Sequence, residues 1–380
     1  MSDVRAAPDA IVVGGGLVGW ATAYALARRG LPALVIDAGD DGAATFAGAG
    51  MITPGTNLDP PPGYLPLAIA ATRHYPPLIT ELAEAGCGET GYATPGAIYV
   101  ARDGVEVVGL ERVEHTLNER RDAGMALIGA VERISGERAR ELFPPLSPGV
   151  PAAVWYAGGS RVSGRAIRAA IRTGAIKRGC RELAGGATLE RAGNRLRVVD
   201  PLGERHDPEV VVLATGAWTE QSGAEIGIRL RIEPQKGQII HLEWADESPA
   251  DWPLLESAGS HYMLGAPERR IIAGATRETG SGFDTRVTAR GLHEVLTEAL
   301  AIAPGVGPCR LAEIRVGLRP LSADRLPAIG RLGDLVNGWI CAGHGASGLT
   351  LGPVSGELLA QAATGETPEI DLAPYSPSRF

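Results

Sequence analysis

Residues 10–19 read AIVVGGGLVG, a short apolar strand followed by a glycine-rich turn. A helical pattern covers residues 17–29, and residues 33–36 read as a second apolar strand that Asp37 closes. This order is that of a βαβ unit, in which a crossover helix joins two parallel strands. The start of the chain therefore predicts a parallel sheet of the dinucleotide-binding type.

The motif Gly14-x-Gly16-x-x-Gly19 gives each glycine a physical task. The first permits a tight turn, the second lets a pyrophosphate approach the backbone, and the third lets the helix pack closely on the strand. The N-terminus of the helix offers free N–H groups and a partial positive charge to that pyrophosphate. Asp37 can accept hydrogen bonds from ribose hydroxyls and repels a 2′-phosphate, which disfavours NADP. The motif by itself does not choose between NAD and FAD.

Composition narrows the class of protein. The chain has 380 residues, too many for one typical core, so we expect two lobes. The net charge of −8, with no basic stripe, argues against nucleic acid as a partner. No stretch is long and apolar enough to span a bilayer, and the charged N-terminal segment does not resemble a signal peptide. The four cysteines lack paired or metal-ligand spacing, so we expect a cytoplasmic protein with reduced thiols and no metal site.

Two later segments also place small residues where a strand ends. Residues 210–218 read VVVLATGAW, and residues 341–350 read CAGHGASGLT. Small residues let a backbone approach a ligand, and a second helix N-terminus suits the electron-rich side of a reduced flavin. Three glycine-lined turns in this order favour a long, two-part cofactor, namely FAD.

At this point the chain resembles the family of D-amino acid oxidases, glycine oxidases and D-amino acid dehydrogenases over nearly its whole length. The resemblance is greatest to the glycine oxidase and bacterial D-amino acid dehydrogenase branches. It rests on the first glycine motif and on AGM at 49–51, ATGAW at 214–218, PQKGQ at 234–238, GLRP at 317–320 and GHG at 343–345.

This resemblance implies an α/β (α+β) flavoprotein of two lobes. A discontinuous Rossmann-type FAD-binding domain is expected from residues 1–56, 150–232 and 312–380. A substrate-binding domain with a mixed or antiparallel sheet is expected from residues 57–149 and 233–311.

The resemblance also implies non-covalent FAD, held by residues of the three glycine turns and of the segment around residue 50. The expected contacts are Gly14, Gly16, Leu17, Val18, Gly19, Asp37, Ala38, Thr45, Ala49, Gly50, Met51, Ala214, Thr215, Gly216, Trp218, Gly343, His344, Gly345, Gly348, Leu349 and Thr350. Asp37 replaces the glutamate common in the family. His344 also fits a loop histidine bonded to backbone. It is not followed by the arginine found there in glycine oxidase, which weakens the case for glycine itself as substrate.

Two residues are candidates for holding the substrate. Arg319 is expected to follow a strand and precedes Pro320, and a guanidinium fixed there could grip a carboxylate through two parallel hydrogen bonds. In the enzymes that the chain resembles, the arginine of the GLRP motif binds the substrate carboxylate, and a tyrosine at the place of Tyr262 donates to the same group. The sequence alone leaves open a structural salt bridge for Arg319 and simple packing on the sheet for Tyr262.

The expected reaction is oxidation of the C–N bond of a small amino acid or secondary amine that carries a carboxylate. Hydride transfer to flavin N5 would leave an imine, which water hydrolyses to a keto acid plus ammonia or an amine. Three alternatives stay open: a dehydrogenase of the same fold that passes electrons to a quinone or another carrier instead of O₂, a nicotinamide-linked dehydrogenase, and a flavin-binding subunit without activity. A homo-oligomer is compatible with all of them.

Overall fold

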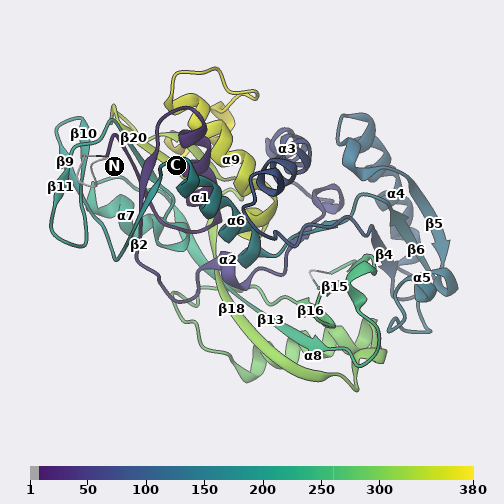
Figure 1. Ribbon diagram of the computed structural model, residues 1–380. Coiled ribbons are helices and arrows are strands. Elements are labelled where there is room, and N and C mark those ends of the chain that lie inside the picture. The colour runs from purple at the N-terminus through teal and green to yellow at the C-terminus, as the bar shows by residue number, and fades with distance from the viewer. Residues whose placement is uncertain (1–7, 260) are drawn as a thin grey trace.

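The computed structural model describes residues 8–259 and 261–380, which form two main β-sheets with helices packed on them (Figure 1). The charged N-terminal segment, which was not expected to be a signal peptide, covers residues 1–10, and its first seven residues lie outside the described ranges. Within the described ranges, no helix is both long and apolar enough to cross a lipid bilayer.

The first sheet confirms the predicted βαβ unit. Its six strands lie in the order β19-β20-β12-β1-β2-β8, all parallel except β19, which pairs antiparallel with β20. Helix α1 (Leu17–Arg28) joins the neighbouring parallel strands β1 and β2. The strands are β1 (Ala10–Val13), β2 (Ala33–Asp37), β8 (Arg181–Ala184), β12 (Val210–Leu213), β19 (Ala328–Arg331) and β20 (Gly338–Ala342).

Both faces of this sheet are buried, as parallel sheets require. Successive residues of a strand point to opposite faces, so Ala10 and Val12 face one hydrophobic cluster while Ile11 and Val13 face another. On the first face lie α1, α3 (Tyr64–Glu84), α6 (Gly164–Lys177) and α9 (Gly348–Ala363). On the second lie α7 (Thr219–Glu225) and a small sheet of β9 (Thr188–Ala192), β10 (Arg195–Val199) and β11 (Arg205–His206). Helices α1 and α9 pack side by side, which brings the two ends of the chain together (Figure 1).

The second sheet is mixed, as predicted. Its order is β17-β13-β16-β15-β14-β4-β6-β5, with β18 paired to β13; β14 and β4 are parallel and the other pairs antiparallel. The strands are β4 (Ala97–Ala101), β5 (Val131–Ser135), β6 (Ala152–Tyr156), β13 (Ile232–Glu243), β14 (Leu254–Ser257), β15 (Tyr262–Ala266), β16 (Arg270–Gly274), β17 (Glu278–Thr279) and β18 (Arg310–Ser322).

The two faces of the second sheet have different surroundings. Leu255, Met263 and Ala273 pack with α5 (Gly136–Leu142) and α8 (Ala289–Ile302) in a hydrophobic cluster. The alternate residues Glu256 and Tyr262 point to the other face and line a cavity. Helix α4 (Val107–Asp122) covers the end of the sheet formed by β4, β5 and β6.

One strand boundary differs from the sequence expectation. The strand expected to end at Leu318 continues to Ser322, so Arg319 lies within β18 and does not follow it. Pro320 stands opposite Pro234 of β13. Opposite residues of an antiparallel pair either exchange two hydrogen bonds or none, and two prolines fit the pairing without bonds. The ladder therefore continues and fixes the backbone of Arg319.

Short elements connect the two sheets: α2 (Ala44–Ala47), β3 (Met51–Ile52), the 3₁₀ turn η1 (Pro54–Thr56) and β7 (Ser160–Arg161). We propose that each sheet is the centre of one lobe, with the boundaries expected from the sequence, except that β6 and residues 312–322 of β18 run in the second sheet. Strands β6 and β18, which run in the second sheet, lead the chain from one lobe to the other.

Candidate active site

A cavity of about 1280 Å³ lies between the carboxyl ends of the parallel strands of the first sheet and the open face of the second. Ligands of open α/β sheets bind at these strand ends. A pocket for one small ligand measures roughly 300–1,000 Å³, so this cavity has room for a dinucleotide and a small substrate.

The turn after β1 is closed so tightly that side chains are excluded. A Cβ on Gly14, whose φ is +105°, would lie 2.3 Å from the carbonyl oxygen of Ala214. A Cβ on Gly15 would lie 2.5 Å from Oδ2 of Asp37, and one on Gly19 would lie 1.9 Å from the carbonyl oxygen of Gly14. The N–H of Gly14 donates to the carbonyl of Ile36 at 2.8 Å, whereas Gly15 and Gly16 line the cavity without a side chain between their backbone and a ligand. This cradle fits the pyrophosphate of FAD.

Two polar side chains complete this end of the cavity. Oγ1 of Thr45 accepts a hydrogen bond of 3.0 Å from the N–H of Leu17, in the first turn of α1. Arg168 of α6 donates from Nε to the carbonyl of Gly15, and its NH2 lies 3.4 Å from Oδ2 of Asp37. Arg168 thus positions the acid expected to meet the ribose. Arg168 was not predicted from the sequence, because nothing in the local sequence distinguishes it from the other arginines of this amphipathic helix.

The structure brings most of the predicted FAD contacts to this one cavity. Of those residues, Gly19 and Gly343 alone are not in its lining. Gly19 packs α1 against the turn, which is the task expected of the third glycine. A Cβ on Gly343 would meet Ile232 at 3.1 Å, so this glycine also serves close packing. Direct contact of the other residues with FAD stays a prediction.

His344 is buried, and its partner differs from the backbone group that the sequence suggested. The hydroxyl of Ser355 donates to the carbonyl of Leu351 at 2.8 Å, so it must accept from Nε2 of His344 at 3.0 Å. The proton therefore sits on Nε2, and Nδ1 is an acceptor without a partner among the described residues. Burial lowers the pKa of His344 to about 4, so the ring is neutral at pH 7.

Arg319 crosses the open face of the second sheet. Its NH1 donates to the carbonyl of Thr276 at 2.9 Å, and its guanidinium lies over Gly237, where a Cβ would be 2.4 Å from NH2. The guanidinium therefore occupies the space that a side chain at position 237 would fill. The structural salt bridge left open by the sequence is not formed within residues 8–259 and 261–380. Desolvation lowers the pKa of Arg319, while the charge of Glu278, which forms no ion pair with it, acts in the opposite direction. A cation removed from water without an ion pair is costly until an anion binds.

Tyr262 reaches the same region from β15. It pairs with Gly274 of β16, and its hydroxyl lies 3.1 Å from where a Cβ of Gly274 would stand. Burial raises the pKa of Tyr262, and the charges of Arg319 and Arg277 act against that rise. The hydroxyl is therefore protonated at pH 7 and can donate to an anion in the cavity.

Two further cavity residues were missed by sequence reasoning. Arg277 lines the cavity beside Arg319 and forms no ion pair with any described residue. Glu256 lines it from β14. An acid within the apolar run LLES at 254–257 is an unusual strand residue, and that pattern was the available signal for Glu256.

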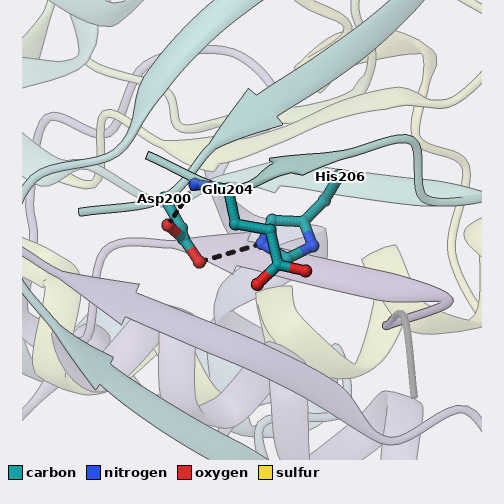
Figure 2. Close-up of side chains that lie close together, drawn as sticks. All are labelled: Asp200, Glu204 and His206. Carbon is teal, nitrogen blue, oxygen red and sulfur yellow. Dashed lines mark hydrogen bonds and ion pairs between the residues drawn. The ribbon is translucent and has the colours of Figure 1, made fainter. Parts of the chain in front are cut away.

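A cluster of three side chains away from the cavity has the residue types of a metal site (Figure 2). Asp200, Glu204 and His206 have ligand atoms within 4.8 Å of one another. Oδ1 of Asp200 accepts from the N–H groups of Leu202 and Glu204, and Oδ2 lies 3.0 Å from Nε2 of His206. Both oxygens are thus used within the turn between β10 and β11, and no metal is needed to account for their positions.

A glycine cradle at the edge of a parallel sheet, joined through one cavity to a half-buried guanidinium on a second sheet, defines a two-lobe dinucleotide-binding protein. The family model described as FAD dependent oxidoreductase (DAO) matches residues 9–362, and the chain belongs to this family. It is therefore an FAD-dependent oxidoreductase, which confirms the predicted fold, enzyme class and cofactor and excludes the nicotinamide alternative.

Relatives and solved structures cover nearly the full length. The uncharacterized oxidoreductase YurR of Bacillus subtilis (strain 168) is 36% identical over 97% of this chain and 98% of its own. Glycine oxidase of Geobacillus kaustophilus (strain HTA426) is 28% identical over 98% and 97%. The crystal structure of iminodiacetate oxidase from Chelativorans sp. BNC1 is similar at a TM-score of 0.93, with 38% identity over 97% of this chain and 98% of that one.

Proposed function

We propose that this oxidoreductase oxidises the C–N bond of a small amino acid or secondary amine that carries a carboxylate. The observation that carries the proposal is Arg319, a half-buried guanidinium on the wall of the FAD cavity that lacks an ion-pair partner among the described residues. The names of the relatives, glycine oxidase and iminodiacetate oxidase, point to the same substrate chemistry.

The chain's own residues bind and orient the substrate. The chemistry that bound FAD supplies is uptake of a hydride at N5. Arg319 holds the substrate carboxylate, Tyr262 donates its hydroxyl to the same group, and the two fix which C–H bond faces the cofactor. The second sheet closes the cavity on this side and limits the entry of water. The imine left by the oxidation is hydrolysed to a keto acid plus ammonia or an amine.

Anaerobic mixing of the purified flavoprotein with single amines tests this proposal. The panel is glycine, sarcosine, several D-amino acids, L-proline and iminodiacetate, and we expect at least one to bleach the visible flavin absorption. Readmitting air then separates an oxidase, whose colour returns at once, from a dehydrogenase that needs a quinone or another carrier. A flavin that no carboxylate-bearing amine reduces contradicts the proposal and favours a subunit without activity.

Within this class we propose a secondary amine with two carboxylates as the preferred substrate. Arg277 is the observation that favours it, because it places a second guanidinium on the cavity wall beside Arg319. Two guanidinium groups on the cavity wall, neither in an ion pair with a described residue, suit two anionic groups on one ligand. The similarity to iminodiacetate oxidase supports the same choice.

Replacing Arg277 with Met tests the second carboxylate. A hydrogen bond to a charged group contributes about 1.5–3 kcal/mol, so we expect KM for iminodiacetate to rise by about tenfold to a hundredfold. KM for sarcosine, which has one carboxylate, should change little. Arg290→Met is the matched control, because Arg290 is an exposed arginine of α8 outside the cavity lining. Equal losses for both amines in R277M would contradict the role of Arg277.

A further inference from the structure

Glu256 is an acid on the inner wall of the cavity. Its neighbours in register on the adjacent strands are Tyr99 of β4 and Tyr262 of β15, and all three line the cavity. Its neighbour in sequence, Leu255, points to the opposite face and packs in the core. The register of three strands therefore aims this carboxyl group at the space where the substrate is proposed to bind.

Three hydroxyl groups surround the carboxyl group of Glu256. Oε2 lies 2.6 Å from Oγ1 of Thr56 and 3.1 Å from Oγ1 of Thr53, and Oε1 accepts from the hydroxyl of Tyr156 at 2.9 Å. A carboxylate has about four acceptor positions, so about one remains free on the cavity side. An N–H of a bound ligand is the kind of donor that would use it.

This network accommodates Glu256 both with and without a proton. The hydroxyl of Thr56 lies within hydrogen-bond distance of Oε2 and also of the carbonyl oxygen of Thr53, at 2.9 Å. When Glu256 is ionised, Thr56 donates to it. When Glu256 is protonated, it donates to Thr56, whose own proton turns to the carbonyl of Thr53. A proton can thus arrive without any side chain losing its partner.

The segment from Thr53 to Thr56, which carries two of these three hydroxyl groups, is held in place by Arg120. NH1 of Arg120, a buried residue of α4, donates to the carbonyl of Gly55 at 2.6 Å, and NH2 donates to the carbonyl of Asn57 at 2.7 Å. Thr53 and Thr56 are therefore held in place before a ligand binds, which lowers the cost of binding one.

Glu256 and Arg319 line the same cavity from different strands of the second sheet. The guanidinium is tied to Thr276, just beyond β16, and lies over Gly237 of β13, so it stands two to three strand spacings from β14, roughly 10–14 Å across the sheet. An α-amino acid that accepts from one side and donates to the other bridges roughly 9 Å, counting two hydrogen bonds and the ligand itself, and a longer amine with two carboxylates bridges more. The cavity thus offers a cation for the carboxylate and an anion for the nitrogen.

We propose that Glu256 binds the protonated amine of the substrate and accepts its proton before oxidation, an inference that rests on the proposed function. One N–H bond of the ammonium breaks and one O–H bond forms on Glu256, with no change in oxidation state. The nitrogen keeps the electron pair. A neutral amine is the form that can lose a hydride, because its lone pair becomes the second bond of the imine.

The groups around Glu256 are tyrosines and arginines, which keep their protons near neutral pH, so Glu256 is the residue of this set that can accept one. Burial raises the pKa of Tyr99, Tyr156 and Tyr262, so these hydroxyl groups stay protonated at neutral pH. Arg319 and Arg277 lie across the cavity, and Arg120 lies behind η1. Burial also raises the pKa of Glu256 itself, against the hydrogen bonds from Thr56, Tyr156 and Thr53. A carboxylate with a raised pKa is a stronger base.

The test is the pH dependence of anaerobic flavin reduction in Glu256→Gln, using the amine that reduces the wild type fastest. Glutamine keeps the shape but cannot take the proton. We expect the reduction rate to fall by about a hundredfold at pH 7 and to recover as the pH approaches the ionisation of the free amine, whereas the wild-type rate stays nearly constant above neutrality. Binding of propionate, which has a carboxylate and no nitrogen, should be unchanged or tighter in E256Q.

Two controls keep the outcomes distinct. Glu132→Gln removes an exposed acid of β5 in the same sheet and should behave as the wild type. If E256Q does not fold, Tyr156→Phe removes the donor to Oε1 and should move the pH profile upward. A wild-type pH profile in E256Q, or an unmoved profile in Y156F, overturns the role of Glu256. A wild type that no amine reduces overturns the proposed function instead.

Discussion

Replacing Arg319 with Met should lower kcat/KM for every carboxylate-bearing amine by between about a hundredfold and a thousandfold. Removing one partner of a buried charge pair costs roughly 2–5 kcal/mol, and no other group is as well placed to bind the carboxylate. The loss should fall mainly on the dissociation constant measured by anaerobic flavin titration, because Arg319 holds the carboxylate in the ground state as well.

Thermal unfolding separates this role from a structural one. Because Arg319 forms no ion pair with the described residues, removing its charge relieves the cost of desolvating a cation, and we expect Tm to stay the same or rise. Arg315→Met, on the same strand, breaks an ion pair with Glu313 and should leave substrate binding intact. A variant R319M with a lowered Tm and normal substrate affinity would show that Arg319 is structural.

Replacing Gly14 with Ala should abolish stable FAD binding. The new Cβ would stand 2.3 Å from the carbonyl oxygen of Ala214, and the φ of +105° is a conformation that residues with a side chain rarely adopt. Backbone atoms of β1 or β12 must move, and that movement opens the turn expected to hold the pyrophosphate. We expect G14A to purify without visible flavin absorption and to bind added FAD more weakly by at least about a hundredfold.

A second glycine serves as the control for G14A. Gly109 lies in α4 with no atom within 4 Å of its ideal Cβ and without a positive φ. Gly109→Ala should bind FAD normally and gain about 0.5–1 kcal/mol of stability, because alanine favours a helix. A G14A protein that binds FAD as tightly as the wild type would contradict the assignment of this turn.

Local patterns predicted the parts of the fold that depend on neighbouring residues. The glycine motif and the apolar strands of the βαβ unit follow from spacing over a few residues. The prediction that the strand ends at Leu318 was wrong, because a proline such as Pro320 indicates the end of a strand unless its partner across the sheet is known. That partner is Pro234, some eighty residues away in the chain, so local sequence could not supply it.

The sequence by itself determined that the chain binds a dinucleotide through a βαβ unit, because three glycines and one acid within residues 14–37 define that turn. The tertiary structure decided which side chains lie together on the cavity wall. Tyr99, Glu256 and Tyr262 come from three strands and share one face through the pairing of β4, β14 and β15. A shift of one residue in that register would turn Glu256 into the core, and register is set by contacts far apart in the chain.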